Sequence, residues 1–299
     1  MSAAAAGGAR PTHFGMVTTA KSARYTGPAL DSFFRFTEFG ADDRFVLIDN
    51  DGGYTPPAGL RLECVANPAP KSFAANVNEA IAGALRADAD LVFLNNDIIF
   101  SPGWLPPLKS RDDAILIPLC NQNVVYDHGG FALKAAMDLD EYTGHEDNFL
   151  AIVAAHRADV AMRGMRHSLL IPFYCFRLPH RVMATLGPFD EGFGTGGGED
   201  IDYRVRAHIA GFRVLIAAES YLLHFGGKST WRSGEADAET KTRDALYRRR
   251  LIEKWGVDVA ALFLTHPAAQ QKVSALGLGE LLKSGDYPQL TSLLLARRL

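Results

Sequence analysis

A run of glycines that leads into two carboxylates, Gly192-Phe-Gly-Thr-Gly-Gly-Gly-Glu-Asp-Ile201, is the stretch of this sequence best suited to chemistry. Apolar residues recur at every fourth position from Ile201, which predicts that a helix begins at the carboxylates. Glu199 and Asp200 then lie in the first helical turn, where the helix dipole favours ionised acids. An ionised carboxylate beside glycines, which let a bulky substrate come close, suits a general base. The alternative is that both acids only stabilise the helix start.

Short apolar runs and a helical pattern occupy the first part of the chain. The runs predict strands at Phe14–Val17, Phe45–Ile48, Leu60–Val65, Leu91–Leu94 and Ala114–Leu119. Residues Ser72–Ala87 place their apolar side chains on one face and predict a helix. Strands separated by helices indicate an α/β fold with a mostly parallel sheet. Ligands of such sheets bind beyond the carboxyl ends of the strands.

Polar side chains follow several predicted strands at that edge. Asp97 ends the segment Leu94-Asn-Asn-Asp97 and would be a hard ligand for a divalent cation that bridges phosphates, although this segment is also typical of a turn. His224 follows a later strand and would ligate Mn²⁺ as a neutral imidazole, although lone histidines are more often structural. Asp49 ends another strand, where it either contacts a nucleobase or closes an Asx turn.

Composition limits the classes of function. The 299 residues, 47% of them hydrophobic, can bury one large core or two small ones. A net charge of −3 gives no support for nucleic-acid binding. The three cysteines are odd in number and lack metal-type spacing, which favours reduced thiols in a cytoplasmic protein. No apolar run approaches the length of about 18 residues that a membrane span needs.

In their order along the chain, these motifs resemble the inverting glycosyltransferases of family 2, and especially the rhamnosyltransferase-like branch. That family has the GT-A nucleotide-sugar fold. The resemblance extends from Phe14 to Gly256. It rests on Val46-Leu-Ile-Asp-Asn50, Asn76–Ile81, Leu94–Asp97, Gly187–Gly194, Gly197–Asp202, His224–Gly227 and Lys254-Trp-Gly256.

The resemblance implies transfer of a sugar from a nucleotide-diphosphate donor to a hydroxyl of a glycan or a lipid-linked acceptor, with inversion and with help from Mn²⁺ or Mg²⁺. UDP- and dTDP-sugars are the favoured donors. Asp200, with Glu199 beside it, would be the base, and Asp97 and His224 would hold the metal. The residues implied for the nucleotide side are Thr18, Thr19, Asp49, Asn78, Asn95 and Asn96. Asn95 replaces the first acidic residue of the family's metal motif, which leaves less charge there.

Three regions follow from this reading. We expect a disordered tail at residues 1–11, a GT-A catalytic domain at residues 12–233 and a helical C-terminal appendage at residues 234–299. Within the catalytic domain, a polar segment at residues 121–167 looks like an insertion that shapes a pocket. The appendage carries basic and apolar residues around Arg248–Trp255. It either lies on the inner face of an anionic membrane or, as we expect, packs on the catalytic domain or on another subunit in a homo-oligomer.

Two other readings compete. Gly192-x-Gly194-x-x-Gly197 matches a dinucleotide-binding fingerprint, but a turn rather than a strand precedes it, and Glu199-Asp200 would repel a pyrophosphate at the helix start. Asp202 stands one turn before Arg206, which predicts an ion pair on this helix instead. The second alternative is a non-catalytic nucleotide-sugar or glycan-binding protein of the same fold.

Overall fold

The computed structural model describes residues 10–121, 137–160, 165–167, 169, 172–228, 237–264 and 267–297. Within these residues nine strands form one sheet, with β3-β2-β1-β4-β8-β6-β9-β5 in order and β7 paired to β9. The strands are β1 (Thr12–Thr18), β2 (Arg44–Asp49), β3 (Glu63–Ala66), β4 (Asp90–Leu94), β5 (Ile98–Ile99), β6 (Ala114–Cys120), β7 (Arg166–His167), β8 (Cys175–Leu178) and β9 (Arg213–His224).

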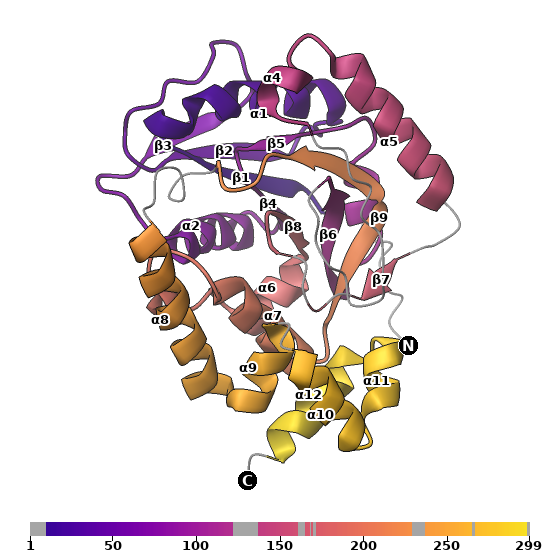
Figure 1. Ribbon diagram of the computed structural model, residues 1–299. Coiled ribbons are helices and arrows are strands. Elements are labelled where there is room, and N and C mark those ends of the chain that lie inside the picture. Colours follow the sequence, from indigo (N-terminus) through magenta and orange to yellow (C-terminus); the bar gives the residue numbers. More distant parts are fainter. Residues whose placement is uncertain are drawn as a thin grey trace, which may run out of the picture.

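Helices cover both faces of this sheet (Figure 1). In Figure 1, α1 (Ala23–Phe36), α4 (Leu139–Tyr142) and α5 (Glu146–Val160) lie above the sheet, and α2 (Phe73–Arg86), α6 (His180–Leu186) and α7 (Glu199–Ile209) lie below it. The remaining helices are α3 (Leu105–Leu108), α8 (Asp237–Trp255), α9 (Val257–Phe263), α10 (Pro267–Ala275), α11 (Gly279–Ser284) and α12 (Tyr287–Ala296). The last five form the helical C-terminal region that the sequence predicts.

The strands that form the site share one direction. β1 pairs in parallel with β2 and β4, and β9 pairs in parallel with β6. β8 runs antiparallel between β4 and β6, so β6 points the same way as β4. The carboxyl ends of β1, β2, β4 and β6 therefore meet at one edge. This arrangement confirms the predicted α/β class with a mostly parallel sheet.

Several boundaries differ from the expectation. β1 begins at Thr12, and residues 10 and 11 of the tail expected at residues 1–11 are described, whereas residues 1–9 lie outside the described chain. The sequence pattern did not predict α1, because Gly27 and Pro28 interrupt its apolar spacing. The third strand covers Glu63–Ala66 rather than Leu60–Val65, and all of it is exposed at the edge of the sheet.

Strand β9 is also longer than expected. It continues as one twelve-residue strand to His224, so that His224 ends this strand rather than follows it. A register shift between Pro118 and Leu119 of β6 lets β9 accommodate the extra residues around Glu219. The longer strand carries His224 to the carboxyl edge of the sheet.

A buried ion pair joins the antiparallel strand to its neighbours. Arg177 of β8 is 2% exposed, and its Nη2 donates to Asp90 Oδ2 at 2.6 Å and to Asp112 Oδ1 at 2.5 Å. The second oxygen of Asp90 accepts the N–H of His180 at 2.8 Å. Because the charges of Arg177 and Asp90 are buried, each of these two side chains depends on the other for compensation.

We expect Asp90→Asn to lower the free energy of unfolding by about 3–5 kcal/mol, the usual loss when one partner of a buried pair is neutralised. Asp113→Asn is the matched control, because it breaks the exposed pair between Asp113 and Arg111, and it should cost less than about 1 kcal/mol. Denaturant unfolding followed by circular dichroism measures both. Similar small losses would show that Arg177 does not depend on the charge of Asp90.

Candidate active site

A network of hydroxyls and one amide lies beneath the carboxyl edge of the sheet. Asn96 follows β4 and is fully buried, and its Nδ2 donates to Ser22 Oγ at 2.7 Å and Thr26 Oγ1 at 2.9 Å. Thr18, at the end of β1, lies 2.6 Å from the same Thr26 hydroxyl. Thr19 shares a hydrogen bond of 3.0 Å with Ser22. These side chains therefore join β1 and β4 to α1, and place Thr18 and Asn96 under the site rather than on its surface.

Asp49 closes the loop that follows β2. Its Oδ1 accepts the N–H of Gly52 at 3.1 Å, and its Oδ2 accepts the N–H of Tyr54 at 2.9 Å. Among its sequence-based interpretations, the turn is the one that these contacts match. The carboxylate is 2% exposed, so in this conformation the turn occupies its hydrogen-bonding capacity.

Asn78 contacts backbone of a distant loop. Its side-chain amide accepts the N–H of Phe189 at 2.7 Å and donates to the carbonyl of the same residue at 3.1 Å. The amide also donates to Glu191 Oε1 at 2.8 Å. Asn78 thus holds α2 against the loop that leads to the paired carboxylates. In the structure, Asn78 therefore fixes the position of this loop through hydrogen bonds.

Asp97 and His224 form a close pair at the carboxyl edge. β5 pairs with the end of β9, so that Ile98 lies opposite His224. As a result, Oδ1 of the fully buried Asp97 lies 3.3 Å from Nε2 of His224. Its Oδ2 accepts the N–H of Lys228 at 3.1 Å, and its carbonyl accepts the N–H of Phe225 at 3.0 Å. Asn95 is tied in beside them through its N–H, which donates to the Tyr174 carbonyl at 2.8 Å.

The two side chains shift each other's protonation. Burial favours the neutral form of Asp97, but the adjacent imidazole and the Lys228 N–H outweigh it and lower the pKa of Asp97. Burial likewise opposes the charged form of His224, yet the carboxylate raises the pKa of His224 well above its ordinary value. In the protein without a metal ion, Asp97 is therefore the carboxylate and His224 the protonated imidazole of an ion pair near neutral pH.

This pair fits a divalent cation that a diphosphate helps to hold. Carboxylate Oδ1 and imidazole Nε2 already converge, and both are ligands of Mn²⁺. In the part of the chain that the structure describes, no group of three or more His, Cys, Asp or Glu side chains converges as metal ligands. Cations that act on phosphates commonly use one or two protein ligands and complete their shell with phosphate oxygens and water. Asp97 and His224 supply such a partial set.

Glu199 and Asp200 differ in their surroundings. Glu199 is 5% exposed, and its Oε2 accepts the N–H of Gly197 at 2.5 Å, so this carboxylate turns back into the glycine loop. Asp200 is half-buried, and its Oδ2 accepts the N–H of Phe173 at 3.4 Å. The next residue, Tyr174, stacks its ring on His224, with 4.7 Å between ring centroids. Two consecutive residues thus link Asp200 to the Asp97–His224 pair.

The glycines before these carboxylates make room for helix α8. Gly197 and Gly198 have φ values of 115° and 87°, which disfavour other residues. A Cβ on Gly197 would lie 3.0 Å from Arg243 Nη1, and a Cβ on Gly198 would lie 3.1 Å from the side chain of Tyr247. Close packing of α8 is therefore a second reason for glycine here, beside the substrate access that the sequence suggests.

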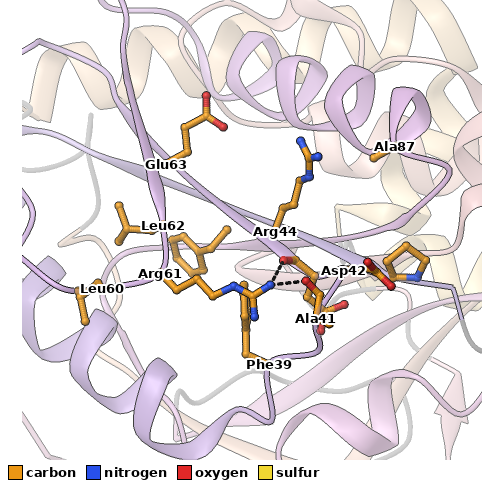
Figure 2. A pocket seen from close by; sticks show the side chains of 12 residues that line it. Phe39, Ala41, Asp42, Arg44, Leu60, Arg61, Leu62, Glu63 and Ala87 are labelled. Atoms are coloured by element: carbon orange, nitrogen blue, oxygen red, sulfur yellow. Dashed lines mark hydrogen bonds between the residues drawn. The ribbon is translucent and has the colours of Figure 1, made fainter.

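Several hollows of the described chain lie elsewhere. One of about 740 Å³ is lined by Phe39, Arg44 and Arg61 among others, with Glu63 on its far side (Figure 2). Arg44 begins β2, so this hollow lies at the amino edge of the sheet, opposite Asp97. Residues 122–136 and 229–236, which follow Asn121 and Lys228 at the carboxyl edge, lie outside the described residues. Most of the polar part of the expected insertion falls there too.

Comparison with known proteins bears on the fold. No protein-family model matches the chain, and no curated protein matches it. A crystal structure of GalNAc-T7 with UDP, GalNAc and Mn²⁺ superimposes with a TM-score of 0.59, at 14% identity, over 94% of this chain and 55% of that one. The chain has the GT-A fold. It spans about half the length of that GalNAc-T7 structure.

A second GT-A protein gives the same result. Residues 1–349 of TarS from S. aureus, crystallised with UDP-GlcNAc, superimpose with a TM-score of 0.51, at 12% identity, over 85% of this chain and 71% of that one. At such low identity the likeness concerns the fold. The glycosyltransferase fold expected from the motifs is therefore confirmed, whereas assignment to family 2 and its rhamnosyltransferase-like branch stays a prediction.

The C-terminal helices of this GT-A chain pack on α7. Val205 of α7 lies in one buried cluster with Leu290 and Leu294 of α12. Leu251 of α8 is fully buried in another cluster, so the residues that suggested a membrane-facing surface partly point inward. Among the described helices, none combines the length and the apolar character that crossing a bilayer requires. Packing on α7 is the arrangement that the structure shows for these helices.

We expect Gly198→Ala to destabilise the protein more than Gly211→Ala. Both glycines flank α7 and have similar φ values, 87° and 82°, but only Gly198 has neighbours within 4 Å of an added Cβ. Gly211→Ala should cost about 1–2 kcal/mol of backbone strain. Gly198→Ala should cost about 1–3 kcal/mol more, because it overpacks the contact with α8. Equal losses in denaturant unfolding would contradict the packing role.

Proposed function

We propose that this protein is a metal-assisted glycosyltransferase that moves a sugar from a nucleotide-diphosphate donor to an acceptor hydroxyl with inversion. The observation that carries the proposal is the grouping at one sheet edge of a GT-A fold. There the buried Asp97–His224 pair and the Asp200 carboxylate are linked through Phe173-Tyr174. This transfer requires residues that hold the cation and a separate carboxylate that acts as the base.

Helix geometry favours Asp200 over Glu199 as the base. Successive residues of an α-helix point about 100° apart. Asp202 is fully buried against α8, where Trp255 Nε1 donates to it at 2.8 Å. Asp200 therefore points about 200° away from Asp202, toward the opposite side, whereas Glu199 points only about 60° away from it. Asp200 is thus the carboxylate that faces away from α8 and toward Phe173, whose neighbour Tyr174 stacks on His224.

In this proposal each residue of the site has a separate role in the transfer. A divalent cation supplies charge neutralisation for the departing diphosphate when it is bound. Asp97 and His224 would hold that cation, and the Lys228 N–H fixes the second oxygen of Asp97. Asp200 accepts the proton of the acceptor hydroxyl, which attacks the anomeric carbon opposite the leaving group. One base and an in-line displacement give inversion at that carbon.

Uridine nucleotides are the first donors to test. GalNAc-T7 was crystallised with UDP and Mn²⁺, and the TarS fragment with UDP-GlcNAc. We propose a UDP- or dTDP-sugar as donor and a glycan or lipid-linked acceptor. We also propose the cytoplasm as the site of action, with contact at the inner face of the membrane when the acceptor is lipid-linked.

We expect Asp97→Asn to remove the metal-linked part of nucleotide binding. A thermal-shift screen of UDP, dTDP, GDP and CDP with and without Mn²⁺ first selects the nucleotide. At a ligand concentration of 100 Kd, wild-type protein gains about 2.7 kcal/mol. The variant should lose the difference between Mn²⁺ and EDTA, because the ionised ligand is gone. Asp112→Asn, an exposed carboxylate away from the site, is the control. An unchanged metal response in Asp97→Asn would exclude Asp97 from the site.

We expect Asp200→Asn to lower kcat by a factor of about 10²–10⁴, the range for loss of a general base. Donor affinity should stay nearly unchanged, since asparagine keeps the size of aspartate. Glu199→Gln should have a smaller effect on kcat, because Glu199 turns toward the glycine loop. Transfer to an acceptor, or donor hydrolysis until one is known, measures both. Wild-type turnover in both variants would show that neither carboxylate is the base, whereas donor binding with no turnover in the wild-type protein would favour a nucleotide-sugar-binding protein without transferase activity.

A further inference from the structure

Helix α8 contacts α7, the helix that carries Asp200, through one buried carboxylate. Asp202 Oδ1 accepts from Trp255 Nε1 at 2.8 Å and lies 2.6 Å from Lys254 Nζ. Its Oδ2 accepts from Arg206 Nε at 3.0 Å, which confirms the ion pair expected from the sequence. Asp202 is fully buried. A carboxylate so enclosed is stable only while its donors stay in place, so α7 cannot turn without breaking these contacts.

The same lysine also contacts the other end of the glycine loop. Lys254 Nζ lies 2.8 Å from Asp190 Oδ2, and Arg250 Nη2 lies 3.1 Å from the same oxygen. Partial burial opposes the charge of Asp190, but Lys254, the Gly192 N–H and Arg250 lower the pKa of Asp190 to about 2. Both ends of the segment from Asp190 to Asp202 are therefore tied to α8.

Local structure alone does not fix the start of α7. Its N-cap is Gly198, which has no side chain to cap the helix, and Gly197 before it also has a positive φ. Glycines have wide backbone freedom, so the direction of the first turn of α7 depends on contacts from other segments more than on the chain that enters it. A rotation of one residue step, about 100°, would carry Asp200 away from Phe173.

We infer that Trp255 and Lys254 are positioning residues for Asp200. They hold Asp202 on the α8 side of α7 and so keep Asp200 on the opposite side, where it accepts the Phe173 N–H. The inference rests on the proposed function, because Asp200 is the base only in that proposal. Its physical part concerns this chain alone, since two residues of the C-terminal region set the direction of a carboxylate in the catalytic domain.

Trp255→Phe tests this arrangement, because it removes the indole N–H and keeps an aromatic ring. Trp104→Phe is the matched control: the buried Trp104 donates its indole N–H to Thr37 Oγ1 at 2.9 Å, away from the site. We expect both variants to lose thermal stability. Only Trp255→Phe should lower kcat, by roughly tenfold, with the donor KM unchanged, and Lys254→Met should act in the same direction. Arg249→Gln, at an exposed position of the same helix, should leave kcat unchanged.

A double variant separates positioning from general destabilisation. In an Asp200→Asn background, Trp255→Phe should lower kcat no further, because the residue that it positions is already inactive. A further tenfold loss there, or an equal loss of kcat in Trp104→Phe, would overturn the inference. Unchanged turnover in Trp255→Phe would overturn it as well, while leaving the proposed function in place.

A measurement without turnover covers the case in which the proposed function itself is wrong. The Phe173 amide donates to Asp200, so amide hydrogen exchange at Phe173 reports where that carboxylate lies. We expect faster exchange at Phe173 in Trp255→Phe and no change in Trp104→Phe. Equal protection of the Phe173 amide in both variants would show that α8 does not orient Asp200, whatever reaction the site performs.

Discussion

Carboxylates that leave water must find donors inside the protein, and this demand organises the molecule at four places. Asp90 is met by Arg177, Asp49 by the N–H groups of its own loop, and Asp97 by His224 and Lys228. Asp202 is met by donors from two helices. Asp90, Asp97 and Asp202 each join segments that are far apart in the sequence, whereas Asp49 closes its own loop, so together the acids help to place strand ends and helix starts.

The distribution of these acids separates rigid from responsive parts of the site. Asp49 receives only backbone donors, which cannot be withdrawn without unfolding the loop. Asp97 instead shares its Oδ1 with an imidazole, a partner that can exchange a proton for a cation. Asp200 is half-buried, and its one donor from another segment, the Phe173 N–H, lies at 3.4 Å, so it keeps capacity to accept a proton from elsewhere.

Much of the fold was accessible from the sequence, because buried parallel strands appear as continuous apolar runs. Such runs located β1, β2, β4 and β6, and with them the polar residues at their ends. Helix α1 was missed, since Gly27-Pro28 obscures its pattern. The sequence also could not show that Ile98 pairs with His224, because a two-residue strand has no periodicity to detect. Asp97 and His224 were identified from separate motifs, and the resemblance assigned both to one metal site. Their contact is visible only in the structure.

The region of the candidate catalytic carboxylates shows a second limit of prediction from sequence. Local spacing predicted the α7 ion pair between Asp202 and Arg206, which lie one turn apart. It could not predict that Trp255 and Lys254 contact Asp202, because those residues are distant in sequence and belong to a different region. The glycine loop was interpreted as an opening for substrate for the same reason. The glycines of a loop do not indicate whether a substrate or a helix from another region occupies the space beside them.

The contact between α8 and Asp190 and Asp202 has a consequence for synthesis of the protein. A ribosome completes β1 to β9 before it makes Lys254 and Trp255. Until those residues emerge, the nascent chain carries two acids without their main cationic partners, one of them in a position meant to be sealed from water. Residues up to 233 therefore contain Asp190 and Asp202 but not the α8 side chains that neutralise or donate to them. The contacts of Asp190 and Asp202 are therefore completed by a helix that contributes neither a strand to the sheet nor a candidate metal ligand.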